Sequence, residues 1–439
     1  MSPSSINDSL GKNRIVINVL VAFLYSAYYN YIYSDYIVSL YGSSFIKMST
    51  SIFIEYLIIC TFPIVFFKGI YNLASLFSIF NYVFVYIPFM ETLYTGGYGP
   101  EYNAYKIVFL IFTILFFATD NLKLLRGPFK KKGIISFRVF EIGSLVLLSA
   151  LLLLNIRNLH FTNFVESKSD LYDLRSNLSI VGGSIAVYFL YWLKCAFLPC
   201  LLVYYLRKNN LVKAAIAFVS FILLFMLDQQ KITFFIPFLI ILLFALTKWK
   251  KKLLTNHFFA LIVFALVAVS FVLNQNKDSS PILYELAAIF IMRIQCIEGM
   301  ELNTYLRFFG SDGSYHPYTH YSHIGIVNSI TGSYPYDMSL GHAVTYGGAN
   351  ANGCFWLMDG IAADGIVGCI IISVVFLFIK ALFNSIGEKY DSRYCYIIFI
   401  FAVSMMMNVS IFTALLTCGL IALYLILALV DLKPLELGN

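Results

Sequence analysis

Residues 258–273 read FFALIVFALVAVSFVL, a run without a charged side chain. A membrane-spanning helix needs about 20 mostly apolar residues, and we predict that this run is the centre of one such helix near 257–274. The whole chain has the same character, because 60% of its 439 residues are hydrophobic and only 12% are charged. Soluble domains contain about 45–50% apolar and about 25% charged residues. The composition therefore excludes a soluble globular enzyme, and the surplus apolar side chains must face lipid.

Similar apolar runs recur along the chain. They predict an all-α polytopic membrane protein with about 12 transmembrane helices and one large loop late in the chain. The predicted spans lie near 15–33, 50–67, 72–91, 104–120, 139–156, 184–206, 212–227, 232–247, 257–274, 361–382, 394–411 and 413–431. No internal repeat relates the two halves, which weakens a transporter fold built from inverted repeats.

The distribution of basic residues predicts the orientation of these helices. If the chain crosses the membrane alternately, the loops 121–138, 207–211 and 248–256 lie on one side, and they hold the clusters of Lys and Arg. Lys and Arg collect in cytoplasmic loops. We therefore expect a multi-pass protein with both termini in the cytoplasm.

One outward segment interrupts the regular pattern. Residues 275–360 separate nine predicted helices in 1–274 from three in 361–439, and four of the six histidines of the chain lie within them. Long loops in otherwise tight architectures are usually functional. We expect the chemistry of the protein in this segment.

The outward segment opens with an apolar stretch, 283–298, that is too short to span and carries isolated charges. It is typical of an interfacial or re-entrant helix at the outer leaflet. Arg293 would then lie at headgroup depth, where a guanidinium binds phosphate or diphosphate oxygens in a bidentate manner. The alternative is that Arg293 extends to the interface without a ligand, or pairs with Glu285 or Glu298.

Three histidines follow at spacings of four and three: His316, His320 and His323. They could ligate a metal, but Pro317 interrupts any helix that would align them, and no carboxylate or thiolate stands at ligand spacing. We therefore predict no metal. One histidine acting as a general base is the more plausible role, since its pKa lies near neutrality. The alternative is hydrogen bonding to carbohydrate or to the backbone of the loop.

Tyrosines are interleaved with these histidines. They suit stacking on sugar rings and equally suit an aromatic belt at the membrane surface. The six are Tyr305, Tyr315, Tyr318, Tyr321, Tyr334 and Tyr336.

The outward segment closes with glycines and two acids. Asp359 precedes the tenth predicted span and Asp364 lies in its first turns. A carboxylate there could take part in chemistry, or it could cap a helix N-terminus. The glycines would let the backbone approach a ligand or a neighbouring helix closely.

Two lysines stand in apolar surroundings, Lys194 in the sixth span and Lys231 in a short outer turn. Charges at such positions normally line a cavity or have a partner. Lys231 is the better site candidate because it emerges on the side of the long loop, and Asp228 could neutralise it. The sequence contains no phosphate-binding Gly loop, zinc-protease motif, nucleophile elbow or dinucleotide fingerprint.

Several of these motifs together resemble the O-antigen polymerases of the Wzy type. They are the Asp-Gln-Gln-Lys turn at 228–231, Ile-Met-Arg at 291–293, Tyr-Leu-Arg-Phe-Phe at 305–309, and the Asn-Gly-Cys-Phe-Trp-Leu-Met-Asp-Gly-Ile-Ala-Ala-Asp-Gly-Ile-Val-Gly run at 352–368. The resemblance is strongest over 225–385, and the first half of the chain matches in hydropathy alone.

The resemblance implies a GT-C-like membrane glycosyltransferase of the bacterial inner membrane that acts at the periplasmic face in lipopolysaccharide biosynthesis. It would join oligosaccharide repeat units carried on undecaprenyl diphosphate, without metal, cofactor or nucleic acid, and possible partners are membrane lipids and a regulator of chain length. Arg293, Lys231 and Arg307 would hold the diphosphate. The base would be one of His316, His320 and His323, ahead of Glu298 and Asp359.

Two other functions fit the same plan. An O-antigen ligase transfers finished polymer to lipid A-core and shares many of these signals. A flippase for lipid-linked oligosaccharide would also have about 12 spans, but it would be expected to show two related halves and would not need a dominant outer loop.

Overall fold

The computed structural model describes residues 3–38, 45–70, 72–124, 133–160, 180–249, 257–310, 316–322, 324–353 and 355–436. These residues form helices joined by turns. The extended pairing found among them is limited to two isolated bridges, Ile135 with Val430 and Tyr390 with Glu436. The prediction of an all-α fold is confirmed.

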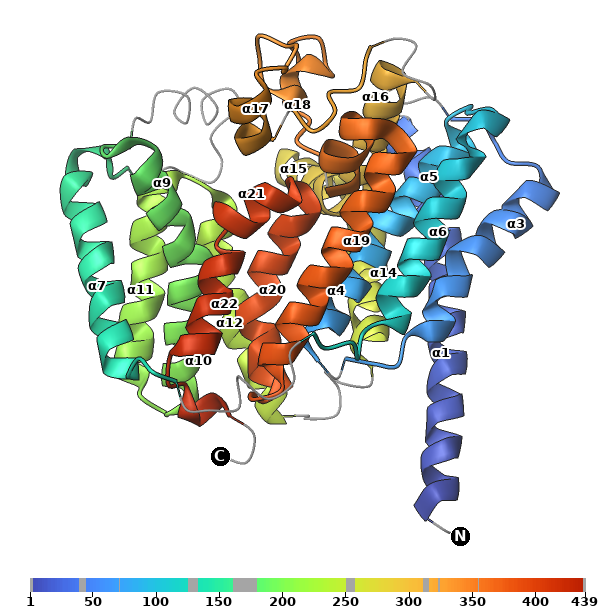
Figure 1. Ribbon diagram of the computed structural model, residues 1–439. Coiled ribbons are helices and arrows are strands. Elements are labelled where there is room, and N and C mark those ends of the chain that lie inside the picture. Colours follow the sequence, from blue (N-terminus) through green and yellow to red (C-terminus); the bar gives the residue numbers. More distant parts are fainter. Residues whose placement is uncertain are drawn as a thin grey trace. The chain divides into compact units, whose positions relative to one another are not determined.

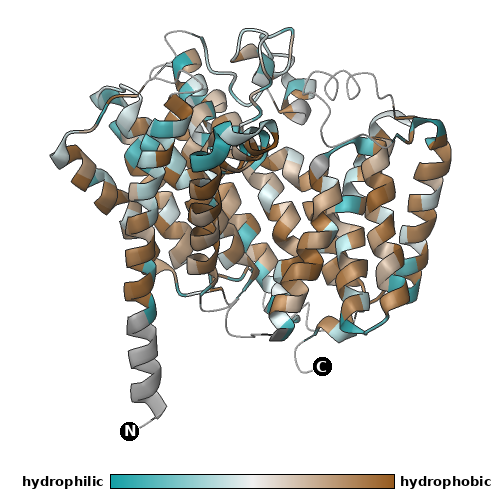
Figure 2. Cartoon of the chain, turned by 180° about the vertical axis from the view of Figure 1, so that it is seen from behind, coloured by the Kyte–Doolittle hydropathy of each residue, from teal (hydrophilic) through white to brown (hydrophobic). Residues whose placement is uncertain are grey.

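Within the described ranges, 9 helices are long and apolar enough to cross a membrane. They are Arg14–Val38, Leu73–Thr95, Pro100–Ala118, Phe137–Leu154, Gly183–Arg207, Leu211–Asp228, Phe258–Ser279, Phe355–Gly387 and Ile411–Leu429. The chain is therefore a multi-pass membrane protein by helix length and hydropathy. Many of its large apolar side chains are exposed, as expected for surfaces that face lipid: Phe264 is 72% exposed and Leu211 71%. Figure 2 shows the hydrophobic colour along most helices.

The other three predicted spans coincide with shorter apolar helices. These are Thr50–Phe66, Ile232–Lys248 and Arg393–Asn408. The positions of all twelve apolar runs are thus matched by helices, and nine of them meet the length and hydropathy expected of a span.

The helices divide into two compact units that do not follow the order of the chain. Unit 1 comprises Met1–Leu122, Thr255–Ala381 and Met406–Ile411, and unit 2 comprises Lys123–Leu254, Leu382–Met405 and Phe412–Asn439. The α-helices that begin in unit 1 (Figure 1) are α1 Pro3–Ile32, α3 Thr50–Thr61, α4 Leu73–Asn81, α5 Ile87–Thr95, α6 Asn103–Ala118, α14 Phe258–Asn276, α15 Pro281–Ala287, α16 Ile297–Phe309, α17 Gly325–Thr331, α18 Leu340–Ala343, α19 Ala362–Gly387 and α21 Ile411–Leu416. Those that begin in unit 2 are α7 Phe137–Leu154, α9 Gly183–Trp192, α10 Leu198–Arg207, α11 Leu211–Asp228, α12 Lys231–Trp249, α20 Ser392–Asn408 and α22 Leu420–Leu429.

Wider π-helical turns interrupt several of these helices. Three of them carry residues singled out by the sequence: Leu193–Phe197 carries Lys194, Ala288–Cys296 carries Arg293, and Phe355–Ile361 carries Asp359. Such turns occur frequently at functional sites.

A buried ion pair lies in each unit. In unit 1, the Lys380 ammonium donates to Asp120 Oδ1 at 2.9 Å and to Ser78 Oγ at 2.7 Å. In unit 2, the Lys194 ammonium donates to Asp228 Oδ2 at 2.7 Å and to Gln230 Oε1 at 2.8 Å. Both lysines are 0–1% exposed. Pairing of this kind makes a charge inside an apolar fold tolerable.

The tenth predicted span is preceded by a helical segment that runs back alongside it. The backbone leaves helical geometry at Asp364 and Gly365, and a Cβ placed on Gly368 would lie 2.1 Å from the Gly360 carbonyl oxygen. Trp356 on one arm donates from Nε1 to Ser373 Oγ on the other. Residues 355–363 and 366–373 therefore form a helical hairpin with its tip at 364–365. The glycines permit this approach, as the sequence predicted for a neighbouring helix.

The hairpin lies against α6. Its contacts with α6 show in which direction the two arms of the hairpin run. The Trp356 ring packs between Phe109 and Phe116, with ring centroids 4.9 and 5.7 Å away. At the tip, a Cβ on Gly365 would lie 3.3 Å from the hydroxyl of Tyr105, in the first turn of α6. The first arm thus begins beside the middle of α6 and ends at its N-terminal end. It is buried, and irregular backbone at this depth is tolerated only within protein or beside a water-filled cavity.

Candidate functional site

A turn of the outward segment holds the tip of the hairpin. Thr319 N–H donates to the Ala362 carbonyl at 2.9 Å, and His320 N–H donates to the Ala363 carbonyl at 2.6 Å. His320 and Tyr321 have φ angles of 47° and 69°, a left-handed conformation that bulky residues rarely adopt. Consecutive residues of this kind persist only where the surroundings determine them, and they cluster at functional sites.

This turn brings His320 next to Asp364. His320 Nδ1 lies 3.9 Å from Asp364 Oδ1, and the two side chains are 76% and 39% exposed. The separation is that of an ion pair rather than of a direct hydrogen bond. A carboxylate beside Nδ1 favours a proton on that nitrogen and leaves Nε2 as the proton acceptor. The pair can act as a general base that water and substrate can reach.

A second polar group lies where α16 begins. The Glu301 carboxylate accepts a hydrogen bond from the Gly353 N–H and interacts with the Arg293 guanidinium. Burial raises the pKa of Glu301 to about 7, although both of these neighbours act in the opposite direction. Arg293 itself is exposed. An exposed guanidinium therefore interacts with a carboxylate that is partly protonated at neutral pH.

Arg307 belongs to a different face of α16. Positions 301 and 305 share one face of a helix, whereas 303 and 307 share the opposite face. Tyr305 donates to the Ala351 carbonyl at 3.1 Å, and Tyr98 donates to Asn303 Oδ1 at 2.6 Å. The Arg307 guanidinium acts on the Tyr98 hydroxyl and partly offsets the rise in its pKa that burial causes. Arg293 and Arg307 thus interact with different groups, Glu301 and Tyr98 respectively.

Three other predicted bases are buried or packed against neighbouring side chains. Asp359 is fully buried, and it accepts from Ser410 Oγ and from the Ile411 N–H at 2.6 Å, at the start of α21. The carboxylate therefore caps α21, whereas from sequence it was considered as a cap of the tenth predicted span. Glu298 is 2% exposed. The His316 ring stacks on Phe308 with centroids 4.0 Å apart.

The other two predicted site residues are His323 and Lys231. His323 lies outside the described residues. Lys231 is the first residue of α12 in unit 2, whereas Arg293, Arg307 and the described histidines of the outward segment belong to unit 1. Asp228, considered from sequence as a partner of Lys231, accepts from Lys194 Nζ, Thr233 Oγ1 and the Gln230 N–H.

Glu301 and the partnership of Asp364 with His320 were missed from sequence. Glu301 lies four positions before Tyr305, so a shared helix face was a usable signal. The sequence gives no sign that His320 contacts Asp364, which lies 44 positions later. The contact depends on the hairpin, and the hairpin depends on the close approach of Gly368 to Gly360.

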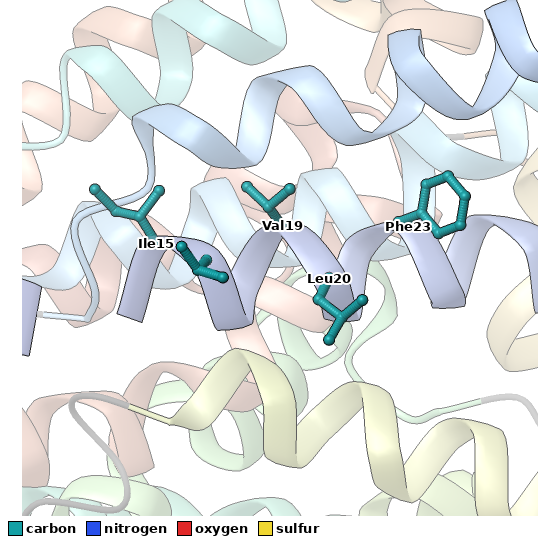
Figure 3. Close-up of a pocket in the computed structure, with 5 residues that line it drawn as sticks. Ile15, Val19, Leu20 and Phe23 are labelled. Carbon is teal, nitrogen blue, oxygen red and sulfur yellow. The ribbon is translucent and has the colours of Figure 1, made fainter. Parts of the chain in front are cut away.

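Other features of the described residues do not add a ligand site here. No group of three His, Cys, Asp or Glu side chains among them could hold a metal ion. Figure 3 shows a hollow on α1 lined by Ile15, Val16, Val19, Leu20 and Phe23. All five are apolar, which suits contact with lipid chains rather than catalysis.

No protein-family model, curated protein or solved structure matches this chain. Its function is therefore inferred from its own residues and geometry.

Proposed function

We propose that this protein is a glycosyltransferase that polymerises undecaprenyl-diphosphate-linked oligosaccharide repeat units into a surface polysaccharide of the O-antigen type. In this proposal it acts at the periplasmic face of the bacterial inner membrane, with a GT-C-like arrangement of about 12 spans. The observation that carries the proposal is the exposed His320–Asp364 pair, held by backbone hydrogen bonds at the tip of a hairpin in a membrane protein.

The reaction needs one proton acceptor and one site for a leaving anion. The acceptor sugar hydroxyl attacks the anomeric carbon of the donor glycan, and the bond from that carbon to the diphosphate oxygen breaks. His320 Nε2 takes the hydroxyl proton, and Asp364 stabilises the imidazolium that forms. The lipid diphosphate departs with the bonding electrons.

Arginine supplies the charge for that anion. An exposed guanidinium can bind two diphosphate oxygens at once, and donors already in place as charge develops stabilise the transition state. Arg293 is the first choice because it is exposed and interacts with Glu301. Arg307, which is exposed on α16 of the same unit, is a further candidate.

The test is the lipopolysaccharide ladder of the source bacterium after deletion of the gene and complementation with variants. We expect core plus a single repeat unit in the deletion strain, and the same pattern for His320→Ala and Arg293→Ala at normal membrane levels. His257→Ala, which changes an exposed histidine at the start of α14, should restore the full ladder.

Three outcomes would overturn the proposal. Core alone, with polymer retained on the lipid carrier, would indicate a ligase. Absence of any outward-facing repeat unit would indicate a flippase. Long chains in both His320→Ala and Arg293→Ala would remove the assigned chemistry from this site.

A further inference from the structure

The outward segment also carries a partly exposed cluster of aromatic rings, and we propose that this cluster binds the pyranose rings of the glycan. We define the aromatic platform as Phe308, His316, Tyr334, Tyr336 and Tyr346. The inference rests on the proposed function and adds to it a subsite for the neutral sugar part of the substrate.

The platform is built on the last turn of α16. Phe308 is 3% exposed, and the His316 ring lies parallel to it, with an interplanar angle of 8° and centroids 4.0 Å apart. The rings of Tyr336 and Tyr346 approach Phe308 at 5.8 and 5.5 Å. His316 is thus fixed on a buried ring while its own surface remains partly exposed.

Tyr346 provides the outermost ring. It is 77% exposed, and its φ angle is 53°. A left-handed conformation is unfavourable for a bulky residue and persists only where neighbours impose it. Here the Tyr346 N–H donates to the Ala343 carbonyl at 3.0 Å, and the Gly347 N–H donates to the His342 carbonyl at 2.9 Å. A large aromatic side chain is therefore held out in solvent by the backbone.

Polar groups at the platform match a sugar. The Tyr346 hydroxyl lies 3.5 Å from His316 Nε2, and the Tyr336 hydroxyl is buried without a hydrogen-bond partner among the described residues. Asp337, next to Tyr336, is exposed. Tyrosine presents an apolar ring face together with a polar tip, and a pyranose presents an apolar C–H face bordered by hydroxyl groups.

Charge identifies which part of the substrate this would be. The sequence has no Lys or Arg between Arg307 and Lys380. A diphosphate requires cations, and none of the five platform residues is Lys or Arg, so the platform suits the neutral sugars. The rings would then hold the glycan while the diphosphate is bound elsewhere in the protein.

The experiment measures binding of two probes to the full-length protein in nanodiscs. The probes are the oligosaccharide released by mild acid from the source bacterium's own polysaccharide, and undecaprenyl phosphate. We expect Tyr346→Ala and His316→Ala to weaken oligosaccharide binding about fivefold to tenfold and to leave undecaprenyl phosphate binding unchanged. Tyr346→Phe should stay within about twofold of wild type, because the ring remains.

Tyr284→Ala is the matched control, since Tyr284 is 38% exposed in the same outward segment but outside the platform. It should bind both probes as wild type does. Wild-type oligosaccharide affinity in Tyr346→Ala and His316→Ala would overturn the proposal. Equal weakening by Tyr284→Ala would also overturn it and would indicate a general aromatic belt.

Failure of the platform is distinguishable from failure of the proposed function. If Tyr346→Ala binds the glycan normally while His320→Ala stops chain extension, the platform is wrong and the polymerase stands. If His320→Ala and Arg293→Ala extend chains normally while Tyr346→Ala loses glycan affinity, the catalytic assignment is wrong and the sugar subsite stands.

Discussion

The buried Lys–Asp pairs and the His320–Asp364 pair each join a basic side chain to a carboxylate, but they differ in burial and in distance. Lys380 and Lys194 are 1% and 0% exposed, and each ammonium reaches its carboxylate within 3 Å together with a second side-chain oxygen. His320 and Asp364 are exposed and 3.9 Å apart. Each buried ammonium has a carboxylate and a second side-chain oxygen as partners, whereas the His320–Asp364 pair leaves room for water or substrate. Burial and close contact therefore separate charges that hold the fold from charges suited to chemistry.

Removing one member of a buried pair should have the largest effect on stability. Lys380→Met leaves the Asp120 carboxylate buried with Ser78 Oγ as a donor at 2.6 Å. Breaking a buried pair costs about 3–5 kcal/mol, so we expect a much lower melting temperature in detergent and little accumulation in membranes. The double variant Lys380→Met/Asp120→Asn should recover much of the loss, because the uncompensated charge is gone. Equal melting of Lys380→Met and wild type would contradict this.

The pair in unit 2 should be somewhat more tolerant. After Lys194→Met, Asp228 still accepts from the Gln230 N–H at 2.9 Å and from Thr233 Oγ1 at 2.7 Å. Because these donors remain, we expect a loss of about 2–3 kcal/mol. The same melting experiment ranks the two variants, and a greater loss for Lys194→Met than for Lys380→Met would show that the remaining donors do not matter.

Glu301 is intermediate, since it is partly buried and should make stability depend on pH. Its pKa is raised from 4.5 to about 7 in the folded protein, so the folded state holds a proton that the unfolded chain releases. Stability should therefore fall as pH rises from 4.5 to 7, by about 1–2 kcal/mol after allowance for partial exposure. Glu301→Gln should lack this part of the pH dependence and melt above wild type at pH 8. Parallel melting profiles of the two proteins between pH 4.5 and 8 would refute the assignment.

Substitution in the His320–Asp364 pair should have the smallest effect on stability and a large effect on activity. Asp364→Asn changes a side chain that is 39% exposed, and such changes usually stay within about 0.5 kcal/mol. If Asp364 orients and charges the imidazole, chain extension should fall at least about tenfold. Melting temperature and the polysaccharide ladder are measured on the same preparations. A destabilised Asp364→Asn protein, or one with a full ladder, would place this pair with the structural ones.

The sequence predicted the membrane helices well, because lipid requires long apolar runs and the chain shows them without ambiguity. The length of each helix was harder to predict from the sequence. The run near 50–67 contains enough apolar residues, but α3 ends at Thr61 and a tighter helical turn, Phe62–Phe66, follows it. The run near 394–411 likewise extends past α20, which ends at Asn408.

The site was predicted at the level of segments rather than of contacts. The outward segment contains His320, Arg293 and Glu301, but Asp364 lies 44 positions after His320, and Gly353 lies 52 positions after Glu301. Asp228 illustrates the same limit. From sequence its nearest cation is Lys231, three positions away, whereas in the fold it accepts from Lys194, 34 positions earlier. Pairing between distant positions depends on packing that hydropathy does not encode.

The bonds of Asp359 have a consequence for biosynthesis. Its carboxylate is buried in the first arm of the hairpin, and the donors described above, Ser410 and the Ile411 N–H, lie more than 50 positions later. A ribosome must therefore make nearly the whole protein before the hairpin can be locked. Until then, the nascent chain contains an acidic group inside an apolar segment, which membrane quality-control proteases could recognise. A chain that stops before residue 410 should be degraded rather than inserted as a stable shorter form.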